Sequence, residues 1–192
     1  IFACVRELTK EFENLVDTIT STTKKKIIPI QLDFGKEEQV KSAATEILNA
    51  DIPIDILVNN AGIIHTASFS MTTLKKLKEI FEINFFSQST FTQYILKSMI
   101  KNKKGNILYV SSTSGIDGNM GRSAYSASKA AIISQARVLS KELGAYNIRV
   151  NSIAPGLTNT DMMQNNTSKE AIDKFLANVS LKRFANPEEI AN

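Results

Sequence analysis

The segment IDILVNNAG, which runs from Ile54 to Gly62, carries the pattern from which the fold class of this chain follows. Four of its first five residues are apolar, and the run ends abruptly in Asn59-Asn60-Ala61-Gly62. A short apolar run bounded by turn-forming residues is typical of a strand that is buried on both faces of a sheet. We therefore expect a buried strand over residues 54–58, with a polar turn at its carboxyl end.

On both sides of this segment, short apolar runs alternate with segments whose apolar residues recur at helical spacing. The expected strands are residues 1–5, 27–32, 54–58, 107–110 and 148–153. The expected helices are residues 8–19 and 40–48, a long helix from Leu74 past Met99 that Thr73 caps and Gly105 closes, residues 123–144 with Gly144 as the stop, and a helix that starts at Asn186-Pro187. Buried strands that alternate with helices indicate an α/β fold with a doubly wound parallel sheet, covered on both faces.

In such a fold, ligands bind beyond the carboxyl ends of the strands. Polar side chains stand within a few residues after each of the five expected strands. They are Arg6, Asp33, Asn60, the pair Ser111-Ser112, and Thr158. We therefore expect these residues to line a ligand-binding edge of the sheet.

The composition of the 192 residues excludes several classes of protein. With 43% hydrophobic and 22% charged residues, the chain is typical of one soluble globular domain. A net charge of +4 is too small to indicate a nucleic-acid partner. One cysteine, Cys4, and one histidine, His65, argue against a disulfide framework, a metal centre and a histidine-based hydrolytic triad. No apolar run approaches the ~18 residues of a membrane span, and no secretory leader is visible, so a cytoplasmic setting without a membrane partner is favoured.

The pair Tyr125 and Lys129 is the most informative candidate for chemistry. On a helix, residues at positions i and i+4 share a face, so the phenol and the ammonium project together. A free phenol has a pKa of about 10 and is a poor proton donor near neutrality. A neighbouring ammonium favours the phenolate and lowers this pKa, which would make the pair a general acid–base at physiological pH. Taken alone, such a pair is more often two neighbours on a helix surface.

Four motifs in order give the pair a context. They are Asn59-Asn60-Ala61-Gly62 after a strand, Ser112 placed thirteen residues before Tyr125, Tyr125-x-x-x-Lys129, and Asn151-Ser152-Ile153-Ala154-Pro155-Gly156. In this order and spacing the chain resembles the short-chain dehydrogenase/reductase family, and within it most closely the beta-ketoacyl-acyl-carrier-protein reductases. The resemblance implies a Rossmann-type fold and hydride transfer between NADP(H) and a carbonyl or alcohol substrate.

The resemblance also implies catalytic roles for four residues. Tyr125 would be the acid–base, Lys129 its activator and a ribose contact, and Ser112 the group that polarises the substrate carbonyl. Asn84 matches the asparagine that bends its helix and holds a water in the proton relay. From the residues alone, Ser112 could instead cap a turn after the strand, and Asn84 could face solvent on its helix.

Cofactor selection depends on Arg6, which follows the first expected strand. A carboxylate at this position would accept hydrogen bonds from the ribose hydroxyls and repel a 2′-phosphate, whereas a guanidinium can bind that phosphate. NADP(H) is therefore favoured over NAD(H), and the alternative is a solvated arginine at the strand end. The resemblance implies that further residues hold the adenine, the ribose and the nicotinamide end, namely Asp33, Phe34, Asn60, Ala61, Gly62, Pro155, Gly156, Thr158 and Thr160.

The glycine-rich phosphate turn of the family has no counterpart in the chain. The sequence begins with Ile1, and all eight glycines lie at or after Gly35. Gly115, Gly118 and Gly121 follow Ser112, where they would shape a loop rather than cradle a phosphate. We expect residues 1–192 to form a single NADP(H)-binding catalytic domain that lacks the first strand-turn-helix and the last strand of the fold.

The substrate is the least determined feature of the sequence. An acyl thioester on an acyl carrier protein is implied by the resemblance, and Lys103 and Lys104 could contact an acidic carrier. The turn at Tyr146-Asn147 offers no arginine for this purpose, so a free ketone, sugar or alcohol remains open. His65 could contact substrate or be a loop histidine. The family resemblance implies a homo-oligomer, a dimer or tetramer, through the helices that start near Leu74 and Ser123. A catalytically silent nucleotide-binding protein is the alternative to an enzyme.

Overall fold

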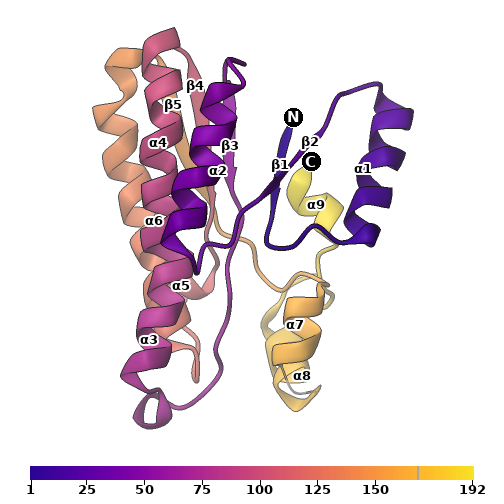
Figure 1. Ribbon diagram of the computed structural model, residues 1–192. Helices are drawn as coiled ribbons and strands as arrows, with labels where there is room; N and C mark the ends of the chain where they lie inside the picture. The colour runs from indigo at the N-terminus through magenta and orange to yellow at the C-terminus, as the bar shows by residue number, and fades with distance from the viewer. Residues whose placement is uncertain (168) are drawn as a thin grey trace.

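The computed structural model describes residues 1–167 and 169–192, and it has an α/β fold in which all paired strands are parallel (Figure 1). One sheet has the order β3-β4-β5, formed by Ile56–Asn59, Gly105–Val110 and Ile148–Ile153. A second sheet pairs β1, Phe2–Val5, with β2, Ile28–Gln31. The predicted fold class is therefore confirmed, although the strands fall into two sheets and no described strand joins β1 to β3.

The register of the three-stranded sheet brings three loops to one edge. Asn59 of β3 lies opposite Tyr109 of β4, which lies opposite Ser152 of β5. The strands therefore end together, as the binding edge of an open α/β sheet requires. Backbone hydrogen bonds extend the alignment past the strand ends, because Ser111 N donates to Ile153 O at 2.8 Å.

Helices separate the strands along the chain and pack with the two sheets. Their bounds are α1 Lys10–Thr23, α2 Glu37–Asn49, α3 Leu74–Phe81, α4 Ser87–Asn102, α5 Ser114–Asp117, α6 Ser123–Glu142, α7 Asp161–Asn166, α8 Lys169–Asn178 and α9 Pro187–Ala191. Short 3-10 turns occupy Phe69–Met71 and Gly144–Tyr146. Figure 1 shows α2 to α6 gathered with the three-stranded sheet, and α1 and α9 drawn with the two-stranded sheet.

Helix starts follow the predicted capping signals. The Thr73 hydroxyl accepts a hydrogen bond from Lys76 N at 3.2 Å, so the predicted cap of α3 is confirmed. Asn186 and Glu189 form a capping box at the start of α9, with Pro187 in its first turn.

One hydrophobic core joins the two sheets. Ile30 on β2 and Val40 on α2 belong to the same buried cluster as Ile107 on β4 and Ile132 on α6. Each of these side chains is about 1% exposed or less. Burying one such aliphatic side chain contributes roughly 1.5–3 kcal/mol, so this cluster holds α2 and β2 against the three-stranded sheet.

Two predicted helix ends are wrong. α4 ends at Asn102, where Lys103 adopts a left-handed conformation with φ 48°, and Gly105 is instead the first residue of β4. A Cβ on Gly105 would lie 2.6 Å from the sulfur of Met99, so this glycine permits close packing of α4 on the sheet. α6 ends at Glu142 rather than Gly144, and the left-handed residue of the following turn is Asn147 with φ 56°.

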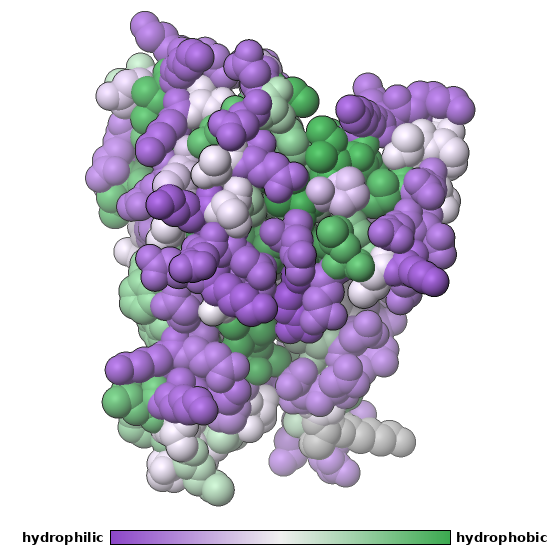
Figure 2. Space-filling model, viewed as in Figure 1, coloured by the Kyte–Doolittle hydropathy of each residue, from purple (hydrophilic) through white to green (hydrophobic). Residues whose placement is uncertain are grey.

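Apolar side chains remain exposed where the two sheets part. Ile56 and Val58 of β3 are 62% and 52% exposed, and Leu15 of α1 is 53% exposed. The expectation that β3 is buried on both faces is therefore wrong, because among the described strands β3 pairs only with β4. Figure 2 shows apolar surface in this central region, between the more polar margins of the molecule. Among the described residues, no helix has the length and apolar character needed to cross a membrane.

Candidate active site

Tyr125 and Lys129 lie one turn apart at the start of α6, beneath the carboxyl end of β4. The Lys129 ammonium is 5.8 Å from the centroid of the Tyr125 ring and donates a hydrogen bond to Val110 O at 2.8 Å. Lys129 is only 4% exposed. Lys129 is therefore buried and Tyr125 partly buried at the sheet edge, and the two are not neighbours on a helix surface.

Burial governs the ionisation of both groups. It lowers the pKa of Lys129 to about 8 and raises the pKa of Tyr125 above its ordinary value. The Ser112 hydroxyl and the Arg122 guanidinium lower the pKa of Tyr125 but do not reverse the effect of burial. The expectation that a neighbouring ammonium lowers this pKa overall is therefore wrong for the described protein, because desolvation of the phenolate outweighs the nearby polar groups.

Ser112 lies in the loop between β4 and α5, and it is 9% exposed. Its hydroxyl accepts a hydrogen bond from Ser114 N at 3.1 Å, so it does close a turn. The same hydroxyl interacts with the Tyr125 phenol, so it also faces the pair on α6. Its neighbour Ser111 donates to Lys129 O at 2.7 Å, which fastens the start of α6 to the end of β4.

Asn84 lies within a π-helical turn, Glu82–Phe86, that interrupts the long helix formed by α3 and α4. Its side chain is fully buried, so the interpretation as a solvent-facing helical residue is wrong. The amide donates to Ile63 O at 2.9 Å and to Ser128 Oγ at 3.1 Å, and its oxygen accepts from Ile63 N at 2.8 Å. A π-turn is a frequent feature of functional sites, and here it aims one side chain at the loop after β3 and at α6.

Gly62 allows the groups of the site to approach the loop after β3. A Cβ on this residue would lie 3.3 Å from Lys129 Nζ and 3.4 Å from Asn84 Oδ1. Both distances are at or below those that ordinary side-chain contacts adopt. The absence of a side chain at Gly62 therefore keeps the space in front of Lys129 and Asn84 open.

The predicted adenosine contacts lie after β1, β2 and β3. Arg6 follows β1 with its side chain 71% exposed, and its Nε is 3.9 Å from Glu7 Oε1. The Asp33 carboxylate accepts a hydrogen bond from Gly35 N at 2.8 Å. Phe34 is partly buried and packs edge-on against Phe91 of the hydrophobic core, with ring centroids 5.9 Å apart. Arg6 and Asp33 thus lie at the sheet edge, whereas the Phe34 ring turns inward.

The predicted contacts at the nicotinamide end lie after β5. Pro155 O accepts a hydrogen bond from Thr113 N at 3.0 Å, which joins this loop to the loop of Ser112. Thr158 donates to Gly156 O at 3.3 Å. Thr160 caps α7 by accepting from Met163 N at 3.4 Å. Of the loop after β3, Asn60 is exposed, and Ala61 O accepts from Gln88 Nε2 at 2.7 Å.

Three residues of the site have no counterpart among the predicted residues. Ser128 is fully buried, donates to Tyr125 O at 2.8 Å and accepts from Asn84. Gln88 is 1% exposed, and its Oε1 has no hydrogen-bond partner among the described residues. Arg122 precedes Tyr125 by three residues and is 8% exposed. Helical spacing from Tyr125 could have indicated Ser128, whereas no helical spacing places Arg122, which precedes α6, and no sequence pattern marks Gln88.

Lys103 and Lys104 do not lie at the entrance of this site. They precede β4, whereas Ser112 follows it, which separates them by about 20 Å at the usual rise of a strand. Lys104 Nζ also forms an ion pair with Asp55 at 2.9 Å. The expectation that Lys103 and Lys104 contact an acidic carrier at the entrance of this site is therefore wrong within one chain.

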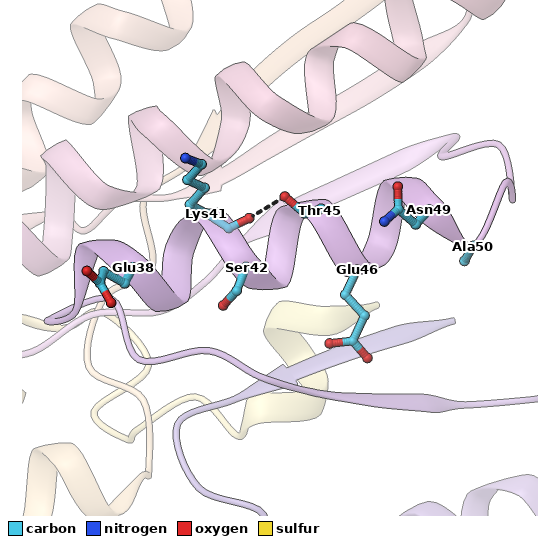
Figure 3. A pocket seen from close by; sticks show the side chains of 7 residues that line it. All are labelled: Glu38, Lys41, Ser42, Thr45, Glu46, Asn49 and Ala50. Atoms are coloured by element: carbon cyan, nitrogen blue, oxygen red, sulfur yellow. Dashed lines mark hydrogen bonds between the residues drawn. The ribbon is translucent and has the colours of Figure 1, made fainter.

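An open hollow of about 820 Å³ lies elsewhere, along the outer face of α2 (Figure 3). It is lined by Glu38, Lys41, Ser42, Thr45, Glu46, Asn49 and Ala50, none of which is a predicted site residue. In the described part of the chain, no three His, Cys, Asp or Glu side chains gather so that they could hold a metal ion.

Comparison with known sequences assigns the class of protein. A profile of the family described as short chain dehydrogenase matches residues 1–171. The chain belongs to this family, as the order of its motifs predicts. The chain is 39% identical over 163 residues to the 3-oxoacyl-acyl-carrier-protein reductase of Aquifex aeolicus, which covers 85% of this chain and 65% of that protein. It is 36% identical to the acetoacetyl-CoA reductase of an Acinetobacter species over 83% of this chain and 64% of that protein. The chain thus spans slightly less than two thirds of both relatives.

Solved structures show the same fold. A protein assigned as a betaketoacyl-ACP reductase superposes with a TM-score of 0.81 at 29% identity, over 99% of this chain and 75% of that one. A protein from Beutenbergia cavernae, assigned as an NAD(P)-dependent gluconate 5-dehydrogenase and containing NADP at low occupancy, gives a TM-score of 0.89 at 26% identity, over 98% and 75%.

Proposed function

We propose that this protein is an NADP(H)-dependent oxidoreductase that interconverts a ketone and an alcohol, with a 3-oxoacyl compound as its substrate. The observation that carries the proposal is the group formed by buried Ser112, partly buried Tyr125 and buried Lys129 at the carboxyl end of β4. A nucleotide-binding protein without catalysis has no need to bury an ammonium beside a phenol. The family and the named activities of the two relatives support the same assignment.

In the proposed reaction, NADP(H) supplies the hydride when it is bound. Ser112 donates a hydrogen bond to the carbonyl oxygen, and Tyr125 donates the proton that completes the alcohol. The Lys129 ammonium stabilises the phenolate that remains on Tyr125. Asn84 and Ser128 act behind this group, because their hydrogen bonds hold the loop of Ile63 and the backbone of Tyr125.

The residues at the sheet edge suit a dinucleotide. Arg6 and Asp33 follow the two strands of the two-stranded sheet, Asn60 follows β3 of the three-stranded sheet, and the small residues Ala61 and Gly62 leave the backbone of the loop after β3 accessible. A Cβ on Gly62 would fill the space in front of Lys129, which supports the close approach of a ribose. Pro155, Gly156, Thr158 and Thr160 would border the nicotinamide end, and the exposed Arg6 guanidinium favours a 2′-phosphate.

The proposal also covers the organisation of the protein. Residues 1–192 would belong to a single NADP(H)-binding catalytic domain, and the enzyme would work as a homo-oligomer. A ketone, sugar or alcohol that is not attached to a carrier protein is the second candidate substrate. The position of Lys103 and Lys104, far from Ser112 within one chain, favours it.

Oxidation of NADPH by an acetoacetyl thioester tests the proposal on the full-length protein. We expect Tyr125→Phe to lower kcat by at least about 1,000-fold, because the proton donor is lost, while NADPH binding persists. Tyr94→Phe, a tyrosine of α4 whose ring lies beside Lys97, serves as the matched control and should retain activity. Undiminished turnover in Tyr125→Phe would exclude the mechanism.

A further inference from the structure

Arg122 is a buried cation whose partners leave most of its hydrogen-bonding capacity unused. Its Nη2 donates to Thr167 Oγ1 at 2.8 Å, and the guanidinium lies over the Phe175 ring, 5.5 Å from the centroid. No carboxylate among the described residues forms an ion pair with it. By contrast, the exposed Arg183 has a two-pronged ion pair with Glu189 at 2.8 Å. A guanidinium carries five N–H donors, so Arg122 retains donors for a ligand.

The position of Arg122 brings this cation to the reacting group. It is the residue directly before α6 and precedes Tyr125 by three residues, so its side chain starts beside the first turn of the helix that holds Tyr125. The electrostatic effect of Arg122 on the pKa of Tyr125 shows that the two groups interact. Thr167 and Phe175 belong to the segment that contains α7 and α8, so Arg122 lies between the phenol and that segment.

A desolvated cation without an anion is costly, and this one is held in a fixed plane. The Phe175 ring and the Thr167 hydroxyl restrict the orientation of the guanidinium. The first turn of α6 contains no acidic residue, and no side chain caps it, so the positive end of the helix dipole adds to the charge of Arg122. A planar guanidinium beside an uncapped helix start is suited to a carboxylate.

We propose that Arg122 binds a carboxylate of the substrate, so that the protein reduces 3-oxo acids as free anions in preference to their neutral esters and thioesters. This inference rests on the proposed carbonyl reduction and specifies its substrate class. The ketone would meet Ser112 and Tyr125, while the carboxylate meets Arg122. Recognition of a free acid also agrees with the distance of Lys103 and Lys104 from the site, since no carrier protein has to dock at its entrance.

Two substrates that differ only in charge test the inference, namely acetoacetate and methyl acetoacetate, with NADPH and the full-length protein. We expect kcat/KM to be at least about tenfold higher for acetoacetate. Arg122→Gln should lower kcat/KM for acetoacetate by about 10- to 100-fold, mainly through KM, because a charge-assisted hydrogen bond is lost. Because the Arg122 guanidinium also lowers the pKa of Tyr125, the value for methyl acetoacetate should fall too, but by a clearly smaller factor than the value for acetoacetate. Arg122→Lys should retain part of the preference for the acid.

Two further variants separate charge recognition from a structural role. Arg137→Gln removes an exposed arginine from the same helix and should leave both substrates unaffected. Thr167→Val removes the hydrogen bond to Arg122 but keeps its charge, so the ratio of the two kcat/KM values should persist. An equal loss for both substrates in Arg122→Gln, or reduction of ester and acid at equal rates, would overturn the inference and leave carbonyl reduction intact. If neither compound nor an acetoacetyl thioester is reduced, both proposals fail.

Discussion

The buried position of Lys129 lowers the stability of the folded protein but serves the proposed reaction. Its ammonium is 4% exposed, and its hydrogen bond to Val110 O does not compensate for lost hydration. Burial therefore holds the pKa of Lys129 near 8 in the folded protein. The same position allows the ammonium to act on Tyr125 in the proposed reaction. Ionisable groups whose pKa values are strongly shifted by burial are common at catalytic sites.

Lys129→Met should stabilise the protein at pH 7 while it abolishes activity. The unfolded lysine has a pKa of about 10.5, so the unfolded state binds the proton more tightly than the folded state, whose pKa is about 8. The folded protein therefore loses stability as the pH falls from about 10.5 to 8, by roughly 3 kcal/mol in total. Loss of the bond to Val110 O offsets about 1 kcal/mol. We expect a net gain of about 2 kcal/mol at pH 7 that disappears by about pH 10.5.

Urea unfolding of the wild type and the variant at pH 7 and pH 10 measures this difference. Lys141→Met, an exposed substitution on the same helix, is the control and should change little at either pH. A stability change of equal size at both pH values would show that the effect arises from packing rather than from the buried charge.

Among the helices, the one from Leu74 to Asn102 shows what periodicity can and cannot predict. Its apolar spacing and the Thr73 cap predict the helix and its start correctly, because both features are local, whereas its predicted end at Gly105 is wrong. The π-helical turn at Glu82–Phe86 was implied only through the resemblance at Asn84, since one inserted residue leaves no signal in an apolar pattern. The π-helical turn depends on hydrogen bonds from Asn84 to Ile63 in the loop after β3. That loop precedes the turn by about 20 residues, so local spacing does not predict the contact.

The same limit applies to the site. The i to i+4 spacing predicted that Tyr125 and Lys129 lie together, and the strand ends predicted the edge at which they lie. Burial of Lys129, the direction of the pKa shift of Tyr125 and the inward turn of Phe34 depend on tertiary packing. α7 and α8 also lay outside the predicted elements. Spacing places residues on a face, but only the assembled fold determines how much water reaches them.

Asn84→Ala tests whether the π-helical turn supports the site. The substitution removes three hydrogen bonds and leaves both backbone groups of Ile63 without this partner, so we expect a loss of about 2–4 kcal/mol in the free energy of unfolding. We also expect kcat to fall, because the start of α6 loses its tie through Ser128. Asn102→Ala, at the exposed end of the same long helix, is the matched control and should stay within about 0.5 kcal/mol. Unfolding and kcat values like those of the control would refute this role.

For the molecule as a whole, the proposed cofactor site connects the two sheets. Arg6 and Asp33 follow strands of the two-stranded sheet, whereas Asn60, Ser112 and Pro155 follow strands of the three-stranded sheet. No described strand joins the sheets, and the core shared by β2 and α2 is a main connection between them. A ligand that contacts both sets of residues should therefore stabilise the entire fold, and a residue at one end of it should discriminate between cofactors.

NADPH at about 100 times its Kd should stabilise the full-length protein by about 2.7 kcal/mol, which corresponds to a rise in Tm of roughly 5–10 °C. Arg6→Ala should raise the Kd for NADPH about tenfold, since its guanidinium would contact the 2′-phosphate, and so remove about half of this rise. The effect of NADH on Tm should be the same in the variant and the wild type, because NADH lacks that phosphate. Arg149→Ala, an exposed arginine on β5, is the matched control. Differential scanning fluorimetry measures the Tm of the wild type and of Arg6→Ala with each cofactor. An equal loss of the Tm rise with NADPH and NADH would mean that Arg6 does not select between them.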